Sequence, residues 1–293
     1  MGEVAGSNPV VPTIFFLPER CDRYDFPPGQ KPKIREDLKN MTHILLTNDD
    51  GYQAAGLLAL AEALGEIATI SIVAPLLEQS GAAQSLTLRR PIICHAVAER
   101  QWAIDGTPAD CVIVALHKLL PEKPDMVIAG INHGANLGEN IYYSGTVGAA
   151  REAALHHIPA VAISLCSKNP KIKFEDSAGI ARATAEMILR HGLPDQVLLS
   201  INIPEKWDGA VRLTRQSKKI TRTQFVEGKD PRGRDYFWLS EQRIDKDVAP
   251  DSDYSAIFSG AVSVTPLHLD PTHTESLEQL AHWAEPLSAV FSR

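Results

Sequence analysis

Features that define several classes of protein are missing from this sequence of 293 residues. No run approaches the roughly 20 consecutive apolar residues that a membrane-spanning helix requires. The four cysteines lie far apart with no C-x-x-C pair, which is typical of buried thiols in a reducing compartment. Basic charge is not in excess, because 29 Lys and Arg face 36 Asp and Glu and the formal net charge is −7. This balance argues against a protein that binds a nucleic-acid duplex.

The N-terminus also lacks a secretory signal, because no basic segment precedes its short apolar run and Glu3 stands where Lys or Arg would be expected. A cytoplasmic location is therefore predicted. Residues 1–40 hold six of the 20 prolines, and their charges cancel, so we expect a poorly ordered extension there. A natural start at Met41 is one explanation for this segment, and an arm that docks on the fold is the other.

From residue 41 onward, apolar runs alternate with amphipathic segments. Strands are predicted at 43–47 and 69–75 with a helix at 56–65 between them, which is a β-α-β unit of the kind that builds parallel sheets. The same reasoning predicts three buried strands and two helices further along the chain, at 126–131, 159–165, 197–203, 147–157 and 175–191. The predicted class is α/β, with a Rossmann-like, mostly parallel sheet flanked by helices over residues 41–210.

The composition changes after residue 210. Residues 211–267 are polar, strand-like and rich in turn signals, and they end in a predicted return strand at 262–267. We interpret this region as an extended, strand-rich C-terminal arm. Residues 268–293 contain an amphipathic helix at 274–291, whose apolar side we expect to pack on the core.

Polar side chains follow three of the predicted strands. Asp49 and Asp50 come directly after the first strand, Ser80 follows the second by a few residues, and Asn132 follows the third. Because the carboxyl ends of parallel strands meet at one edge of a sheet, these side chains should face one crevice. Two adjacent carboxylates repel each other unless they share a cation or a proton. Oxygen ligands of this kind suit magnesium or manganese better than zinc.

The alternative at this motif is a simple turn, since Asp-Gly after a strand is a common turn signal. A second signal lies at the start of the helix near residue 147, where Ser144 and Thr146 stand among backbone N–H groups that favour a phosphate. Ordinary N-capping explains the same two hydroxyls. A metal site beside a phosphate site would indicate phosphoryl-transfer chemistry.

With these residues in view, the sequence resembles the SurE family of 5′-nucleotidases, the survival-protein phosphatases. The resemblance rests on segments that occur in the family's order and cover nearly all of residues 41–267. They include ILLTNDDG (44–51), VAPLLEQSGAAQSLTL (73–88), DGTPADCV (105–112), GINHGANLGENIYYSGTVGAAREA (130–153) and SDYSAIFSGAVSVTPL (252–267). One departure is Ala129, where the family usually has Ser.

The resemblance implies one divalent cation per subunit, Mn²⁺ or Mg²⁺, held by Asp49, Asp50, Ser80 and Asn132. It also implies release of phosphate from nucleoside 5′-monophosphates, and in some members from 3′-monophosphates or short polyphosphates. Homodimers or homotetramers would form through the C-terminal arm. A nucleotide sensor that keeps the pocket without turnover is the alternative function.

Roles can then be assigned to the individual site residues. Asp49 and Asp50 are predicted to be catalytic, with one of them free to orient the attacking water. Asn48 is either a turn residue or a donor to phosphate, and Asn136 either contacts substrate or braces its loop. The predicted phosphate-binding residues at the helix start are Ser144, Gly145 and Thr146. His133 would either protonate the leaving group or be a solvated loop residue.

Overall fold

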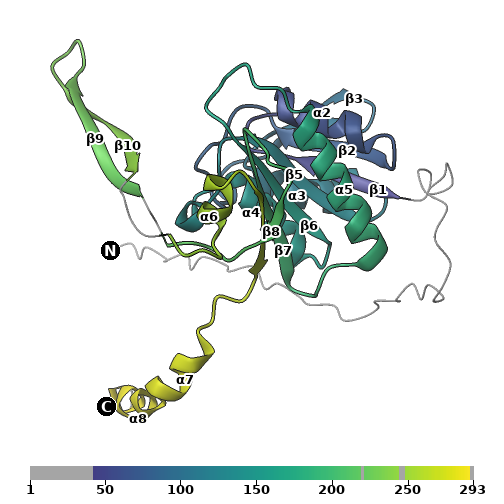
Figure 1. The fold of residues 1–293 in the computed structure, drawn as a ribbon. Helices are drawn as coiled ribbons and strands as arrows, with labels where there is room; N and C mark the ends of the chain where they lie inside the picture. The colour runs from purple at the N-terminus through teal and green to yellow at the C-terminus, as the bar shows by residue number, and fades with distance from the viewer. Residues whose placement is uncertain (1–41, 219–220, 244–247, 291–293) are drawn as a thin grey trace, which may run out of the picture. The chain divides into compact units, whose positions relative to one another are not determined.

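A computed structural model describes residues 42–218, 221–243 and 248–290, so the predicted extension at 1–40 lies outside the described residues. A nine-stranded sheet forms the centre, with strand order β3-β4-β2-β1-β5-β6-β7-β11-β8 (Figure 1). Its strands are β1 (His43–Thr47), β2 (Thr69–Pro75), β3 (Ile93–Ala98), β4 (Gln101–Asp105), β5 (Met126–His133), β6 (Ala160–Cys166), β7 (Val197–Pro204), β8 (Val211–Leu213) and β11 (Val262–His268). Neighbouring strands are parallel except at β3–β4 and β7–β11. The predicted α/β class is confirmed.

Helices cover both faces of this sheet (Figure 1). The helices of this region are α2 (Ala55–Leu64), α3 (Pro108–Val114), η1 (Ala115–Leu119), η2 (Gly138–Tyr142), α4 (Gly145–Leu155) and α5 (Glu175–His191). Helices α2 and α5 share one apolar cluster with Ile44 and Leu46 of β1. Helices α3 and α4 share the other with Leu45. The alternation along β1 shows that it is buried on both sides, as its unbroken apolar run predicts.

Every strand and helix predicted within residues 41–210 is present, with ends that differ by no more than two residues. The prediction missed β3, β4, α3, η1 and η2. All six residues of β3 are exposed, so this edge strand has no apolar run to mark it. Helix α3 is only seven residues long; it begins at Pro108, and Thr107 caps its N-terminus.

The C-terminal region divides between the main sheet and separate elements. Strand β11 confirms the predicted return strand, and it lies between β7 and β8 in the main sheet. Strands β9 (Thr221–Lys229) and β10 (Asp235–Arg243) pair only with each other, in an antiparallel hairpin. Between the hairpin and β11, the arm contains one short helix that was not expected, α6 (Asp253–Phe258).

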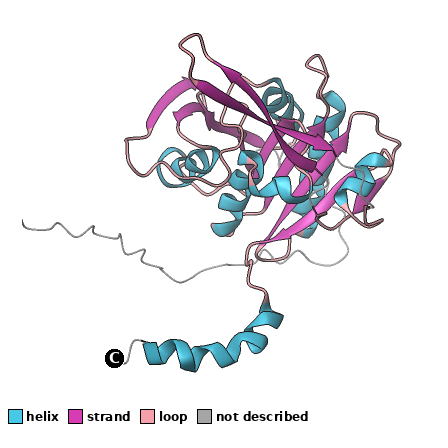
Figure 2. Cartoon of the chain, turned by 90° about the vertical axis from the view of Figure 1, so that its left-hand side faces the viewer, coloured by secondary structure: helices cyan, strands magenta, loops and turns pink. Residues whose placement is uncertain are grey.

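The expected packing of the C-terminal helix on the core stays a prediction. The predicted helix exists as α7 (Thr274–Leu280), η3 (Ala281–Trp283) and α8 (Ala284–Val290), the last helices before the C-terminus in Figure 2. None of their residues is buried, and Leu277 is 62% exposed. The amphipathic pattern predicts an apolar side, but it does not specify which surface covers that side. Among the described residues, no helix combines the length and the apolar character needed to cross a membrane.

Gly56 in α2 is needed because this helix packs closely against β5. A Cβ at Gly56 would lie 2.1 Å from the carbonyl oxygen of Ile131, whereas a Cβ at Gly179 in α5 would meet nothing within 4 Å. We expect Gly56→Ala to lower the free energy of unfolding by about 2 kcal/mol, because backbone must move. Gly179→Ala should raise it by about 0.5–1 kcal/mol through helix propensity alone. Urea unfolding of the two variants tests this, and a shift of the same sign in both would contradict the packing described here.

Candidate functional site

The polar residues predicted to converge do meet in one pocket at the carboxyl ends of β1, β2 and β5. Its volume is about 920 Å³, and its lining includes Asp49, Asp50, Ser80, Asn132 and Ser144. Residues from four separate parts of the chain therefore face one space. The position agrees with the general rule that ligands of open α/β sheets bind outside the carboxyl ends of the strands.

Asp49 is the buried carboxylate of the site, with only 4% of its surface exposed. The hydroxyl of Thr146 donates a hydrogen bond to its Oδ1. Burial raises the pKa of Asp49, while the Thr146 hydroxyl and the backbone amides of Thr146 and Gly145 act in the opposite direction. Gly145 allows this contact, because a Cβ there would lie 2.8 Å from the Cβ of Asp49. The start of α4 is thus built around Asp49.

Asp50 is more accessible and more perturbed. Its Oδ2 accepts a hydrogen bond from the backbone N–H of His133 at 3.2 Å. Burial, the charge of Asp49 and the charge of Glu78 together raise the pKa of Asp50 to about 6. No lysine or arginine is among the described residues that line the pocket. Two neighbouring carboxylates without a basic partner suit a bound cation.

The donor set determines which cation would fit. The described residues contain no group of three or more His, Cys, Asp and Glu side chains that could hold a metal ion. A site built here would instead use two carboxylates, a hydroxyl and an amide oxygen. Such hard oxygen donors favour Mg²⁺ or Mn²⁺ over zinc.

Asn132 reaches the pocket through an irregularity in β5. The β5–β6 register shifts between Ala129 and Asn132, and such a bulge re-aims the side chains near it. Gly130 lies within this segment at φ +137°, and a Cβ there would lie 2.4 Å from the carbonyl oxygen of Ile163. The Asn132 side-chain amide donates to the carbonyl of Gly134 at 2.9 Å. This leaves Oδ1 as the oxygen available to a ligand.

Ser80 lies on the loop between β2 and β3, and it lines the same pocket. Its hydroxyl donates to Oε1 of Glu78 at 2.7 Å, which leaves the lone pairs of its oxygen available to a cation. The backbone N–H of Gln79 donates to the carbonyl oxygen of Asp49 at 2.7 Å. This bond holds the beginning of the loop beside the two aspartates.

The predicted phosphate-binding residues differ in whether they line the pocket. Ser144 lines the pocket and caps α4, because its Oγ accepts the N–H of Val147 at 3.1 Å. Thr146 is fully buried, and its hydroxyl is occupied by Asp49. Asn48 is also fully buried, and both ends of its amide bond to the backbone of Gly51. These are the hydrogen bonds of a turn residue.

Asn136 lines the pocket, yet its hydrogen bonds brace the loop. Its Nδ2 donates to Ser164 Oγ at 2.8 Å, and its backbone N–H donates to Asn202 Oδ1 at 2.9 Å. The Asn202 amide in turn donates to the carbonyl of Asn136 at 3.0 Å. Sequence reasoning missed Ser164 and Asn202. The available signal was a polar side chain inside each of two apolar strand segments.

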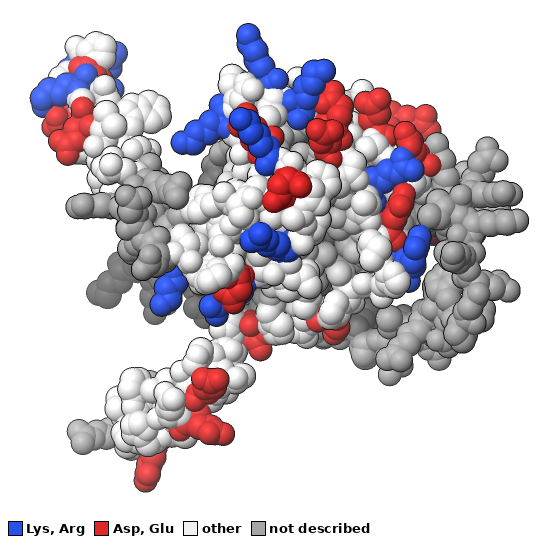
Figure 3. All heavy atoms as spheres, viewed as in Figure 1, with Lys and Arg blue, Asp and Glu red and all other residues white. Residues whose placement is uncertain are grey.

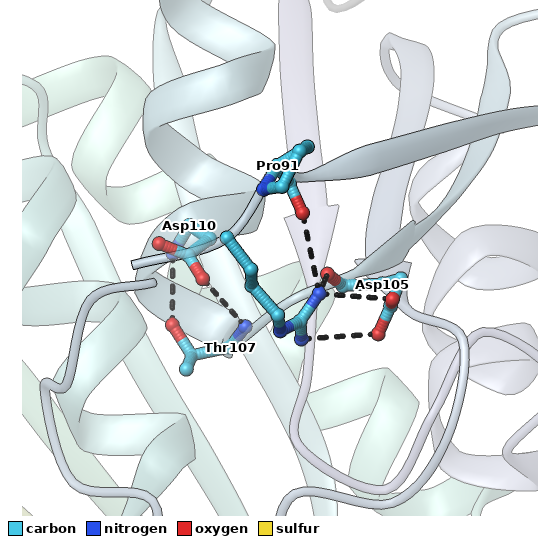
Figure 4. Close-up of polar contacts among 5 residues, drawn as sticks. Pro91, Asp105, Thr107 and Asp110 are labelled. Atoms are coloured by element: carbon cyan, nitrogen blue, oxygen red, sulfur yellow. Dashed lines mark hydrogen bonds and ion pairs between the residues drawn. The ribbon is translucent and has the colours of Figure 1, made fainter. Parts of the chain in front are cut away.

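A second group of contacts joins the motif at 105–110 to the end of the segment between β2 and β3 (Figure 4). The Asp110 carboxylate accepts the N–H of Thr107 at 2.9 Å, and the Thr107 hydroxyl accepts the N–H of Asp110 at 3.1 Å. Arg90 forms a two-point ion pair with Asp105 and also donates to the carbonyl of Pro91. These contacts support the loop, and none of these residues lines the pocket.

Comparisons with known proteins agree with this site and fold. The family described as Survival protein SurE matches residues 44–223. A 5′-nucleotidase SurE from Geotalea uraniireducens is 44% identical over 82% of this chain and 98% of its own, and one from Methylococcus capsulatus is 46% identical over 82% and 97%. The crystal structure of SurE protein from Aquifex aeolicus aligns with a TM-score of 0.75 at 36% identity, over 83% of this chain and 99% of that chain. The chain therefore belongs to the SurE family.

Proposed function

We propose that this chain is a divalent-metal-dependent 5′-nucleotidase that hydrolyses nucleoside 5′-monophosphates to nucleoside and phosphate. The observation that carries the proposal is the meeting of Asp49, Asp50, Ser80 and Asn132 in one pocket beside the start of α4. The name 5′-nucleotidase carried by its relatives supports the same reaction. Nucleoside 3′-monophosphates and short polyphosphates are proposed as additional substrates. Phosphate release from AMP and from such a substrate panel, with and without manganese, tests the activity and separates an enzyme from a nucleotide sensor.

One Mn²⁺ or Mg²⁺ per subunit would be held by the two carboxylates, the Asn132 amide oxygen and the Ser80 hydroxyl. When bound, such a cation polarises a phosphoryl oxygen and lowers the pKa of a bound water. Thr146 fixes Asp49 in one orientation. Asp50 is less constrained, because its one described hydrogen bond comes from the His133 amide. Asp50 is therefore the better placed of the two to orient a water molecule or accept its proton.

The phosphate would lie against Ser144 and the first turn of α4, whose positive dipole end favours an anion. Because the contacts of Gly145 and Thr146 go to Asp49, we assign these residues two linked tasks. They orient the carboxylate, and their position brings the phosphate next to the cation site. Asn136 keeps the adjoining loop in place, and Tyr143 lines the pocket where a nucleoside would extend. A role for His133 in protonating the leaving group remains a prediction.

We also propose a homodimer or homotetramer formed through the C-terminal arm. Phe225 is 60% exposed, and Trp238 and Leu239 are each 69% exposed on the β9–β10 hairpin. A two-stranded hairpin with large apolar side chains in water is marginally stable by itself and favours contact with another surface. A cytoplasmic location is proposed from the free thiols of Cys94, Cys111 and Cys166.

A nucleic-acid duplex is not among the proposed partners. On the face of the described residues that Figure 3 shows, basic and acidic side chains are interspersed and form no continuous basic surface. The formal net charge of −7 also disfavours binding to the negatively charged backbone of a duplex. A mononucleotide needs only the local site at α4.

Two substitutions separate cation binding from turnover. Asp49→Asn removes a charge from the cation site, so we expect weaker manganese binding and a loss of AMP hydrolysis by about two orders of magnitude or more. Asn132→Asp keeps an oxygen and adds a charge, so manganese affinity should hold or rise. Hydrolysis should nevertheless slow at least about tenfold, because the new charge stands near the substrate phosphate. Calorimetry with manganese and AMP hydrolysis measure the two effects, with the exposed Glu62→Gln as the control for charge loss. If Asn132→Asp loses manganese entirely, or hydrolyses AMP like the parent, Asn132 is not a ligand.

The raised pKa of Asp50 predicts a stability effect in the metal-free protein. A carboxyl with a folded pKa of about 6 binds more protons in the folded than in the unfolded state between roughly pH 4 and 6. Its destabilising charge is therefore fully present above pH 6 and disappears as the pH falls. Asp50→Asn should raise the free energy of unfolding at pH 7.5 by about 1–2 kcal/mol, allowing for water around this partly exposed group.

Urea unfolding in the presence of a chelator, at pH 7.5, 6 and 5, measures this effect. The advantage of Asp50→Asn should shrink steadily as the pH falls. Manganese should reverse the order at pH 7.5, because binding stabilises the parent by mass action. A difference that stays constant with pH would show that the Asp50 charge is not its origin.

Removal of the hairpin tests the assembly. We expect the parent to be a dimer or larger by light scattering, and a variant with 221–243 replaced by a short Gly-Ser linker to be monomeric, because the exposed apolar side chains of β9 and β10 are gone. Replacing 270–290 by the same linker gives a comparison in which the hairpin remains. A monomeric parent, or a hairpin-deleted variant with the parent's mass per particle, would contradict this assignment.

A further inference from the structure

The loop that carries Ser80 has little support of its own. We call residues 76–92, which connect β2 to β3, the Ser80 loop. No residue in this loop is fully buried. Gly81 lies at φ +77° with nothing within 4 Å of where a Cβ would be. A hydroxyl on such a loop can serve a cation site only if something outside the loop fixes its position.

The support comes from α4 and from Tyr143 just before it, at a point just past Ser80. The backbone N–H of Ala83 donates to the carbonyl of Tyr143 at 3.1 Å. A Cβ at Gly148 would lie 2.3 Å from the carbonyl oxygen of Ala83, so the helix and the loop are in close backbone contact. The loop therefore runs along α4 directly after the residue that faces the pocket.

One side-chain hydrogen bond secures this contact. Gln84 Nε2 donates to Oε2 of Glu152 at 2.7 Å. Glu152 is only 8% exposed on α4, and its second oxygen lies 3.4 Å from Nε2 of His156. Burial by itself would raise the pKa of Glu152, but the hydrogen bonds from His156 and Gln84 outweigh it and lower the pKa. Glu152 is therefore a charged acceptor, which makes a stronger hydrogen bond than a neutral one.

The rest of the loop is fixed to α3. The hydroxyl of Thr107 donates to the carbonyl of Ser85 at 2.6 Å, and Oδ1 of Asp110 accepts the N–H of Thr87 at 3.0 Å. On the other side of Ser80, Gln79 bonds to the carbonyl of Asp49. Ser80 thus lies in a short span between two anchor points, of which Gln84 is the one made by a side chain.

We propose that Glu152, acting through Gln84, is a positioning residue that holds Ser80 at the cation site. This inference rests on the proposed metal-dependent function. It means that α4 supports the site twice, through Thr146 on Asp49 near its start and through Glu152 on the Ser80 loop further along. Neither Gln84 nor Glu152 is among the residues that line the pocket, so neither contacts the cation or the substrate.

An exchange of donor and acceptor tests the proposal. Gln84→Glu places two carboxylates against each other, so the manganese dissociation constant should rise about tenfold as the loop leaves α4. The double variant Gln84→Glu/Glu152→Gln restores one amide and one carboxylate in exchanged order, and its affinity should return to within about threefold of the parent. Gln84→Ala, which removes the bond without adding charge, should raise the dissociation constant about threefold. Gln279→Glu on the exposed helix α7 is the matched control and should bind manganese like the parent.

Manganese affinity by calorimetry is read beside the melting temperature of the metal-free protein and the kcat and KM for AMP. A positioning role predicts that affinity changes in every Gln84 single variant while the melting temperature of Gln84→Ala stays within about 2 °C of the parent. Unchanged affinity in Gln84→Glu, or a double variant no better than the single one, would overturn the role of Glu152 alone. A parent that binds no manganese would instead overturn the proposed function, and this inference with it.

Discussion

The rest of the site depends on the contact between Thr146 and Asp49, which joins the end of β1 to the start of α4. Asp49 can be buried there because a hydroxyl and two helix-terminal amides compensate its charge. The neighbouring backbone then fixes two more segments, since the Asp49 carbonyl accepts from Gln79 and the Asp50 carboxylate accepts from the N–H of His133. Three parts of the chain are thus held to one pair of consecutive residues. If this contact were lost, the Ser80 loop, β5 and α4 would no longer be held to the same two residues.

The fold was predictable wherever burial leaves a pattern. Strands β1 and β2 and helix α5 have the predicted bounds, because apolar runs and helical periodicity reflect contact with the two cores. Strand β3 was not predictable, because an edge strand exposed at every position has no such pattern. The C-terminal helix shows a related limit of prediction from sequence. Its periodicity was sufficient to predict a helix but not the surface that covers its apolar side.

The location of the candidate site could be predicted from the sequence, but the hydrogen-bond partners of its residues could not. Topology alone brings Asp49, Asp50, Ser80 and Asn132 together, because parallel strands end at one edge of the sheet. The sequence could not decide what each polar group bonds to. The hydroxyl of Thr146, a predicted phosphate-binding residue, donates to Asp49, and the side-chain amide of Asn48, for which two roles were left open, bonds to the backbone of Gly51. Glu152 and Asn202 were not predicted, since their partners lie 68 and 66 residues away.

The position of β11 in the sheet determines how late the edge of β7 is covered during synthesis. Its register joins Val197 of β7 to His268, while β8, β9 and β10 all lie between these residues in the sequence. During synthesis β7 is therefore an open edge of the sheet until β8, β9, β10 and β11 have all been made. Because the cost of closing a loop grows slowly with its length, the intervening arm could be lengthened or shortened between relatives without preventing β11 from returning. Strand β11 therefore covers this edge late. A chain truncated before residue 262 would keep an unpaired β7 edge, which favours aggregation and degradation.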